Sequence, residues 1–201
     1  MSTIVASEVV LVRHGQTEWS RDGLHTGRTD IPLTEIGRRQ ADQLASMLHD
    51  RVFALAISSP LERARATAER ACLDVAVEIS DDLLEWDYGI YEGVTTDAVR
   101  RDIPDWSVWT HPIIDGETLD EVGHRADSVI ERVLRAGSTV LFAHGHFLRI
   151  LAARWLGQSP ETGRLLALDT ATISALGFER ENRVIRRWNE GCHLRGIESP
   201  W

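Results

Sequence analysis

Residues 9–15 read Val-Val-Leu-Val-Arg-His-Gly, a short apolar run that stops at two basic side chains and a glycine. A continuous β-branched run of this length is typical of a strand that is buried on both faces, as in a parallel sheet. Two later runs have the same character, Phe-Ala-Leu-Ala-Ile at residues 53–57 and Thr-Val-Leu-Phe-Ala at residues 139–143. The three runs predict the central strands of one sheet.

Segments with helical periodicity separate these strands. Residues 34–49 carry apolar side chains three and four positions apart, and Thr34 is the expected N-cap. Three further helices are predicted over residues 60–71, over residues 118–135, and over a segment that follows His146 and closes near Gly157.

The end of the chain predicts a different kind of pairing. Residues 172–178 and 183–188 form two strand candidates joined by four polar residues, which is typical of a hairpin at a sheet edge. With a weaker strand candidate at residues 75–79, the order of elements predicts an α/β fold. We expect a mainly parallel central sheet with helices on both faces, a three-layer sandwich. The length predicts a single domain over residues 1–201, with residues 86–116 as a small inserted cap.

The composition excludes several classes of chemistry. All 22 basic residues are arginine, and against 31 acidic residues they give a formal net charge of −9. This charge argues against binding to nucleic acids or anionic membranes, because both need a basic surface. Without lysine the chain cannot form a Schiff base or supply the amine of a Walker-type phosphate loop. Arginine instead favours planar, bidentate recognition of carboxylate or phosphate groups.

The remaining composition features concern location and redox state. The first residues lack the pattern of a signal peptide, and no apolar run has the length of a membrane span. A soluble cytoplasmic protein is therefore expected, and a homodimer is left open as its oligomeric state. Cys72 and Cys192 belong to no Cys-x-x-Cys pair, and the apolar neighbours of Cys72 predict a small buried side chain.

Basic residues follow the predicted central strands at the edge where sites form in open α/β sheets. His14 and His144 end two of these strands, Arg13 precedes His14, and Arg63 lies in the helical turn after the third strand. Together with a helix N-terminus they predict an anion site, most naturally for a phosphoryl group. A metal site at the three histidines, which include His146, is the alternative. The arginine charges disfavour a divalent ion, so no metal or other cofactor is expected.

Short motifs with a fixed order span residues 9 to about 155. They are Leu-Val-Arg-His-Gly-Gln-Thr-Glu-Trp at 11–19, His-Thr-Gly at 25–27, Asp-Ile-Pro-Leu-Thr at 30–34, Ser-Ser-Pro-Leu-Glu-Arg-Ala at 58–64, Leu-Glu-Trp-Asp-Tyr-Gly-Ile-Tyr-Glu-Gly at 84–93, Gly-Glu-Thr at 116–118 and Ala-His-Gly-His at 143–146. The ordered set resembles the histidine phosphatase superfamily, also called phosphoglycerate-mutase-like, far more specifically than an isolated Arg-His-Gly would.

The resemblance implies a phosphohistidine mechanism. His14 matches the nucleophile, and Arg13, Arg63 and His144 match the pocket that neutralises the phosphoryl oxygens. Glu85 matches the acid that protonates the leaving oxygen and then activates water. General chemistry is consistent with these roles, because neighbouring arginines keep an imidazole unprotonated and stabilise the charge on a transferring phosphoryl group.

The resemblance also implies residues that line the substrate. They are Gln16, Thr17, Ser20, Thr26, Gly27, Tyr88 and Gly145. Three arginines outside the motifs are candidates for holding a second phosphate, and each is equally explained as a solvated surface residue: Arg21, Arg28 and Arg100.

The short cap and the lack of a C-terminal lid favour transfer of the phosphoryl group to water. The expected function is a phosphomonoesterase of the acid phosphatase type, acting on a small phosphorylated substrate. The alternatives are a phosphoglycerate mutase, a phosphatase specific for a sugar bisphosphate, and a phosphate- or protein-binding module on the same fold. The last is disfavoured because all five residues that match the family's catalytic set are present.

Overall fold

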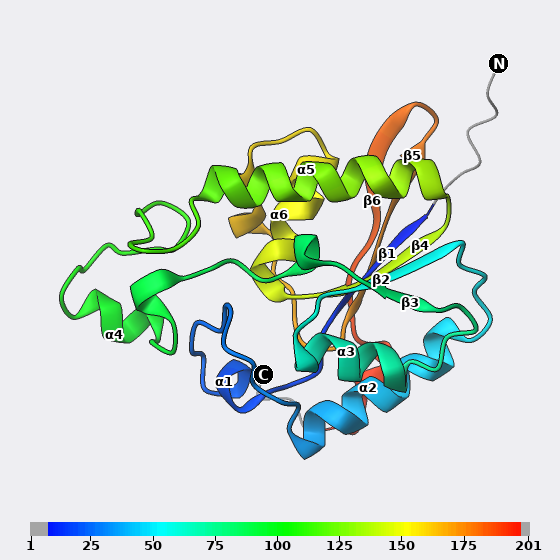
Figure 1. The fold of residues 1–201 in the computed structure, drawn as a ribbon, viewed down its shortest axis with the longest axis horizontal. Helices are drawn as coiled ribbons and strands as arrows, with labels where there is room; N and C mark the ends of the chain where they lie inside the picture. Colours follow the sequence, from blue (N-terminus) through cyan, green and yellow to red (C-terminus); the bar gives the residue numbers. More distant parts are fainter. Residues whose placement is uncertain (1–7, 198–201) are drawn as a thin grey trace.

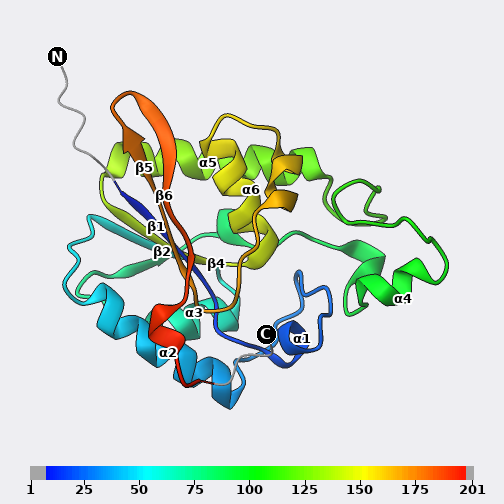
Figure 2. The same cartoon turned by 180° about the vertical axis from the view of Figure 1, so that it is seen from behind.

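A computed structural model describes residues 8–197, in which six strands form one sheet between two layers of helices (Figures 1 and 2). The sheet order is β3-β2-β4-β1-β5-β6. The strands are β1 (Val9–Arg13), β2 (Leu55–Ser58), β3 (Val77–Ile79), β4 (Thr139–Ala143), β5 (Ile173–Glu179) and β6 (Asn182–Glu190).

The first strand lies at the centre of this sheet. It pairs in parallel with β4 on one side and antiparallel with β5 on the other. Strands β3, β2, β4 and β1 are parallel, and β5 and β6 form an antiparallel hairpin whose second strand is the edge. The predicted mainly parallel sheet and its C-terminal edge hairpin are confirmed.

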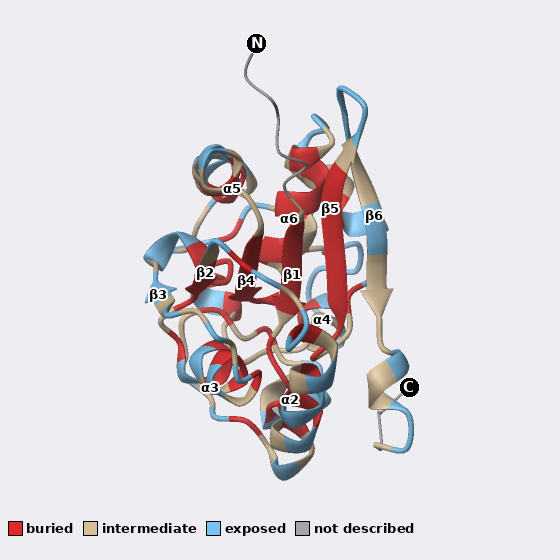
Figure 3. Cartoon of the chain, turned by 90° about the vertical axis from the view of Figure 1, so that its right-hand side faces the viewer, coloured by how far each residue is buried: buried red, intermediate tan, exposed pale blue. Residues whose placement is uncertain are grey.

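Helices cover both faces of the sheet, as predicted (Figure 3). The helices α5 and α6 lie on one face, and α2 and α3 lie on the other. The α-helices are α1 (Glu18–Arg21), α2 (Glu35–Leu48), α3 (Glu62–Arg70), α4 (Thr96–Arg100), α5 (Leu119–Ala136) and α6 (Gly145–Trp155), and short 3₁₀ helices are η1 (Asp81–Leu83), η2 (Gly89–Tyr91), η3 (Pro160–Leu165) and η4 (Cys192–Leu194).

Alternate side chains of β1 enter two separate cores. Val9 and Leu11 pack in the larger core with residues of α5 and α6, and Val10 and Val12 pack with residues of α2 and α3. This follows from the two-residue period of a strand, and it explains why residues 9–12 are apolar without alternation. The centre of the sheet is thereby fixed, and so is the point at which the chain leaves it after Arg13.

The helix caps agree with the sequence, whereas the short elements were not foreseen. Thr34 and Thr118 are the N-caps of α2 and α5, and each side chain accepts a backbone hydrogen bond. Residues 86–116 contain only η2 and α4, and α4 extends away from the sheet in Figure 1. Cys72 is exposed, so its predicted burial is wrong: the chain leaves α3 with Cys72 at φ +50° and buries Ala71 instead.

The loop after β1 is held against α2 by two glycines. A Cβ atom on Gly15 would lie 2.4 Å from the carbonyl oxygen of Gly37, and one on Gly37 would lie 2.0 Å from that of Gln16. Neither distance is compatible with a side chain, so this close approach requires glycine at both positions. Within residues 8–197, no helix combines the length and the apolar character needed to cross a bilayer.

Candidate active site

A polar pocket opens beside the carboxyl end of β1. Seven of the residues predicted for the site line it: Arg13, His14, Ser20, Thr26, Glu85, Tyr88 and Gly145. They come from the end of β1, from α1 and the loop after it, from the segment before η2, and from the N-terminus of α6. The pocket therefore lies at the sheet edge that the strand pattern predicted.

His14 presents a free ring nitrogen in this pocket. The ring is buried, and its Nδ1 lies 2.7 Å from the carbonyl oxygen of Gly15. Since a carbonyl only accepts, Nδ1 carries the proton and Nε2 holds the lone pair. Burial lowers the pKa of His14 well below its usual value, and the charges of Arg63 and Arg13 lower it further.

Arg13 is a cation without a carboxylate partner among the described residues. Its Nη1 donates to the carbonyl oxygen of Leu168 at 2.6 Å, and its buried Nε has no acceptor within residues 8–197. Burial lowers the pKa of Arg13, although the charges of Glu85 and Asp169 oppose that shift. A desolvated guanidinium with an unused donor at a pocket is suited to bind an anion.

Arg63 and His144 lie behind the pocket wall rather than in the lining. Arg63 is fully buried and donates to the backbone carbonyls of Thr26, Gly27 and Thr29 at 2.9–3.2 Å. Its Nε also donates to Nδ1 of His144 at 3.2 Å, so the proton of His144 sits on Nε2, 2.8 Å from Ser59 Oγ. The rings of His14 and His144 lie 5.2 Å apart, which places the positive charge of Arg63 close behind both.

Glu85 receives its position from the first turn of α6. Its Oε1 accepts from the backbone nitrogen atoms of Phe147 at 2.8 Å and Trp86 at 3.0 Å, and its Oε2 accepts from that of His146 at 3.0 Å. The carboxylate thus binds two of the free N–H groups at a helix N-terminus, where the helix dipole also favours negative charge. Only one hydrogen bond reaches Oε2, and this atom keeps a lone pair that can carry a proton.

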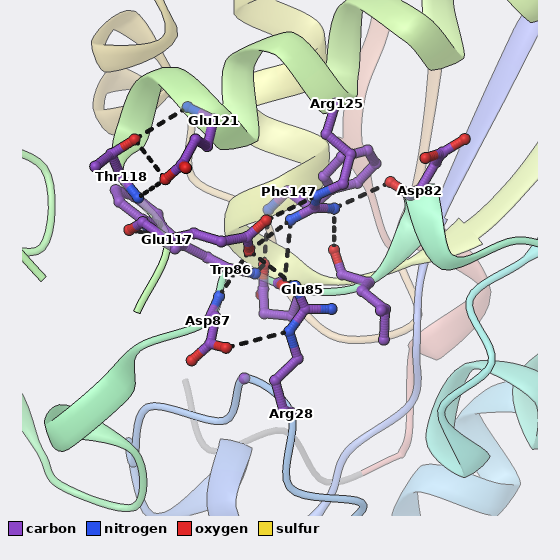
Figure 4. Close-up of polar contacts among 12 residues, drawn as sticks. Arg28, Asp82, Glu85, Trp86, Asp87, Glu117, Thr118, Glu121, Arg125 and Phe147 are labelled. Atoms are coloured by element: carbon purple, nitrogen blue, oxygen red, sulfur yellow. Dashed lines mark hydrogen bonds and ion pairs between the residues drawn. The ribbon is translucent and has the colours of Figure 1, made fainter. Parts of the chain in front are cut away.

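A half-buried ion-pair network fixes the backbone on both sides of Glu85 (Figure 4). Glu117 pairs with Arg125 of α5 at 2.9 Å and with Arg28 at 3.0 Å. The Arg125 guanidinium also donates to the carbonyl oxygen of Leu84 at 2.6 Å. Because this network ties α5 to the strand-like segment before η2, Glu85 is held by several elements and not by its own loop alone.

Three residues expected to line the substrate have other roles. The hydroxyl of Thr17 accepts from the backbone nitrogen of Ser20 and caps α1, and Thr17 is fully buried. Gln16 accepts from the Thr34 hydroxyl at 2.9 Å, away from the pocket. The backbone nitrogen of Gly27 donates to Glu92 at 2.9 Å, and a Cβ there would lie 2.5 Å from a carbonyl oxygen. All three therefore shape loops next to the site.

The lining also contains residues that the sequence did not indicate as substrate contacts. His25, Thr96, His146 and Arg149 all face the pocket. His146 Nδ1 lies 2.6 Å from the Tyr88 hydroxyl, and burial lowers the pKa of His25 to about 4. The spacing of His146 and Arg149, one helical turn apart after the third central strand, is the signal that could have found two of them.

The tryptophans of the cap belong to the core. Trp86 and Trp106 are fully buried, and neither lines the pocket. Trp109 is partly exposed, and the guanidinium of Arg149 lies over its ring, with 4.7 Å between the guanidinium carbon and the ring centre. Within residues 8–197, no group of three or more His, Cys, Asp and Glu side chains has the arrangement of a metal site.

Comparison with known proteins agrees with this geometry. The model of the histidine phosphatase superfamily (branch 1) matches residues 9–191. The chain belongs to this superfamily. The resemblance found in the sequence is thereby confirmed.

Named relatives of the chain include phosphatases and probable phosphoglycerate mutases. It is 43% identical to an acid phosphatase of Mycobacterium tuberculosis, over 88% of this chain and 89% of the relative. It is 34% identical to sedoheptulose 1,7-bisphosphatase of Saccharomyces cerevisiae, over 74% and 67% of the two chains. Among solved structures, the phosphoserine phosphatase of Entamoeba histolytica in complex with 3-phosphoglyceric acid superimposes with a TM-score of 0.84 at 26% identity, over 93% and 98%.

The tautomers of the two site histidines are a first prediction. At pH 6 we expect His14 to be neutral with its proton on Nδ1, and His144 to be neutral with its proton on Nε2. Burial lowers both pKa values, so the folded protein keeps them unprotonated as the pH falls below 6.5, where the unfolded chain takes up protons. Nitrogen-15 NMR of the histidine rings measures both properties.

The control for this titration is the same protein unfolded in urea, in which histidines titrate near a pKa of about 6.5. Protonation of His14 in the folded protein at pH 6, or a neutral ring with its proton on Nε2, would contradict the assignment.

Proposed function

We propose that the chain hydrolyses small phosphate monoesters through a phosphohistidine formed on Nε2 of His14. The observation that carries the proposal is a neutral imidazole, with its free nitrogen in a pocket, beside the unpaired guanidinium of Arg13. Such a pocket attracts a phosphate dianion and presents it with a nucleophile that is itself uncharged. Membership of the histidine phosphatase superfamily and 43% identity to a protein named acid phosphatase support phosphatase activity.

Each residue of the predicted set has a separate task in this proposal. Arg13 and the N-terminus of α6 at Gly145 bind the phosphoryl oxygens, and Arg63 and His144 act from behind the wall. Their contribution is electrostatic, because fixed positive groups stabilise the charge that spreads over the transferring phosphoryl group. Ser20, Thr26 and Tyr88 line the side where the rest of the substrate would lie.

The reaction has two displacement steps. In the first, the lone pair of His14 Nε2 forms a bond to phosphorus as the ester P–O bond breaks, and the leaving oxygen takes a proton from Oε2 of Glu85. In the second, water attacks phosphorus as the P–N bond breaks, and the same carboxylate accepts the proton of that water. The phosphate leaves, and both residues return to their starting states.

Hydrolysis is favoured over transfer to a second substrate hydroxyl. The cap offers no cation to the pocket, since Arg100 donates to the carbonyl oxygen of Trp106 and Arg101 is exposed. The cap therefore adds no charged contact of its own that would retain the dephosphorylated product for a second transfer. The present pocket leaves the phosphoryl group accessible to water, which is the more abundant acceptor.

A panel of phosphate esters tests the proposal. Wild-type protein should release phosphate from nitrophenyl phosphate and from aliphatic monoesters, with the same rate in the presence of a chelator. His14→Ala should lower kcat by at least about a thousandfold, because removal of a nucleophile removes the covalent route. Exposed His49, which pairs with Asp50, supplies the matched control His49→Ala with unchanged kcat.

The result against the proposal is equally specific. Activity that His14→Ala retains, or that the chelator removes, would mean that another residue or a metal ion carries out the reaction.

The proton transfer by Glu85 predicts a dependence on the leaving group. Glu85→Gln should slow release of an alkyl alcohol by about 10²- to 10⁴-fold, the usual contribution of a general acid. Its effect on nitrophenyl phosphate should be less than about tenfold in the first step, because nitrophenolate leaves without a proton. Burst kinetics of phenol release isolate that step.

The matched control is Glu131→Gln, at an exposed glutamate that pairs with Arg135 outside the pocket. Equal losses for alkyl and nitrophenyl esters in Glu85→Gln would show that the carboxylate positions α6 and does not transfer a proton.

A further inference from the structure

Arg149 is a second cation in the pocket, separate from the one that faces His14. It lies on α6, on the same helical face as Gly145 and His146, and all three line the pocket. Arg149 lies four positions after Gly145, which is about 6 Å along the helix axis at 1.5 Å per residue. The backbone of Arg149 thus lies roughly one helical turn beyond the N-terminus of α6, which would bind the phosphoryl group.

The side chain of Arg149 is held in place by groups that do not neutralise it. Its Nε donates to the carbonyl oxygen of Gly163 at 3.1 Å, and its Nη2 donates to that of Arg164 at 3.2 Å. The guanidinium also stacks on Trp109, with its carbon 4.7 Å from the ring centre. These contacts fix the plane of the group and use two of its five N–H donors.

Among residues 8–197, the remaining N–H donors of Arg149 have no acceptor, and no carboxylate forms an ion pair with its guanidinium. Arg154, on the same helix, is neutralised by a carboxylate: its Nε and Nη2 donate to the two oxygens of Asp127 at 2.8–2.9 Å. Burial lowers the pKa of Arg149, the charges of Glu85 and Tyr88 oppose that shift, and the charge of Arg13 adds to it. An anion between the two guanidinium groups would offset both the burial and the repulsion from Arg13.

The arginines that the sequence suggested for a second phosphate are committed elsewhere. Arg21 is exposed and pairs with Asp22, Arg28 pairs with Glu117, and Arg100 donates to the carbonyl oxygen of Trp106. None of the three lines the pocket. Arg149 is therefore the arginine that the fold brings to the substrate side.

We propose that Arg149 binds a second anionic group of the substrate, so that the pocket selects phosphate monoesters that carry another phosphate or a carboxylate. The inference rests on the proposed function, since it takes the first phosphate to lie at His14 and Arg13. Planar guanidinium groups bind phosphate and carboxylate in the same bidentate geometry.

Two matched esters test this selectivity. The compounds 3-phosphooxypropanoate and propyl phosphate share a three-carbon chain and differ in a terminal carboxylate or methyl group. Wild-type kcat/KM should be on the order of 10- to 100-fold higher for the carboxylate, the usual effect of one charge-assisted contact. Arg149→Gln should abolish this preference by lowering kcat/KM for the carboxylate ester more than for propyl phosphate. Arg149→Lys, which keeps the charge, should retain part of the preference.

Arg154→Gln is the control on the same helix and should leave the preference intact, because Arg154 lies outside the pocket. Equal kcat/KM values for the two esters in wild-type protein would overturn the inference. Equal losses for both esters in Arg149→Gln would do so as well, while phosphatase activity itself would stand.

A binding measurement separates failure of the subsite from failure of the catalytic proposal. Calorimetry compares 1,3-propanediphosphonate with propylphosphonate, neither of which can be hydrolysed. The second phosphonate should tighten binding to wild type on the order of 10- to 100-fold and add nothing in Arg149→Gln. If this preference appears in a protein that hydrolyses no ester, the subsite is right and the phosphatase proposal is wrong. If the second phosphonate adds no affinity in wild type, the subsite is wrong.

Discussion

The burial of positive charge without a carboxylate partner is the constraint on which the site depends. Arg63 is fully inside the protein, and backbone carbonyls and one imidazole accept its hydrogen bonds. Arg13 is held by a single carbonyl and keeps a buried donor unused. A desolvated guanidinium costs several kcal/mol unless a negative group compensates it. The fold supports this cost because the loops around Arg63 are built on its donors, and the uncompensated charge makes the pocket an anion site.

The rest of the architecture places two further groups against that charge. Where the chain leaves β1 at the centre of the sheet, it places His14 beside both arginines, and burial together with their charges keeps the pKa of its ring low. Glu85 is held in the same pocket by three backbone N–H groups, two of them from the first turn of α6. The proposed nucleophile and proton carrier are therefore both held by contacts to the regular elements, which is the preorganisation that the proposed phosphoryl transfer needs.

Sequence patterns sufficed for the sheet because β1 must be apolar on both faces. Local motifs and the family resemblance pointed to His14, Arg13 and Glu85, which the fold brings to one pocket. They could not show that the Arg63 side chain points inward to loop carbonyls. Those carbonyls belong to Thr26, Gly27 and Thr29, which lie more than 30 positions earlier in the chain. Sequence patterns could not distinguish Arg149 from other arginines, because its stacking on Trp109 and its lack of an ion pair are tertiary facts. The sequence also showed no sign that the backbone at Cys72 takes a φ of +50°, because the alanine-rich segment before it favours a continuing helix.

The central claim is that a phosphoryl group rests covalently on Nε2 of His14 during turnover. The most direct measurement mixes the protein with a phosphate ester for milliseconds, quenches in alkali, which preserves the P–N bond, and maps the label by mass spectrometry and phosphorus NMR. The account predicts one phosphoryl group on the peptide that contains His14, attached at Nε2 because Gly15 holds the proton of Nδ1. Label on Nδ1 or on another residue, or turnover with no labelled intermediate, would contradict it.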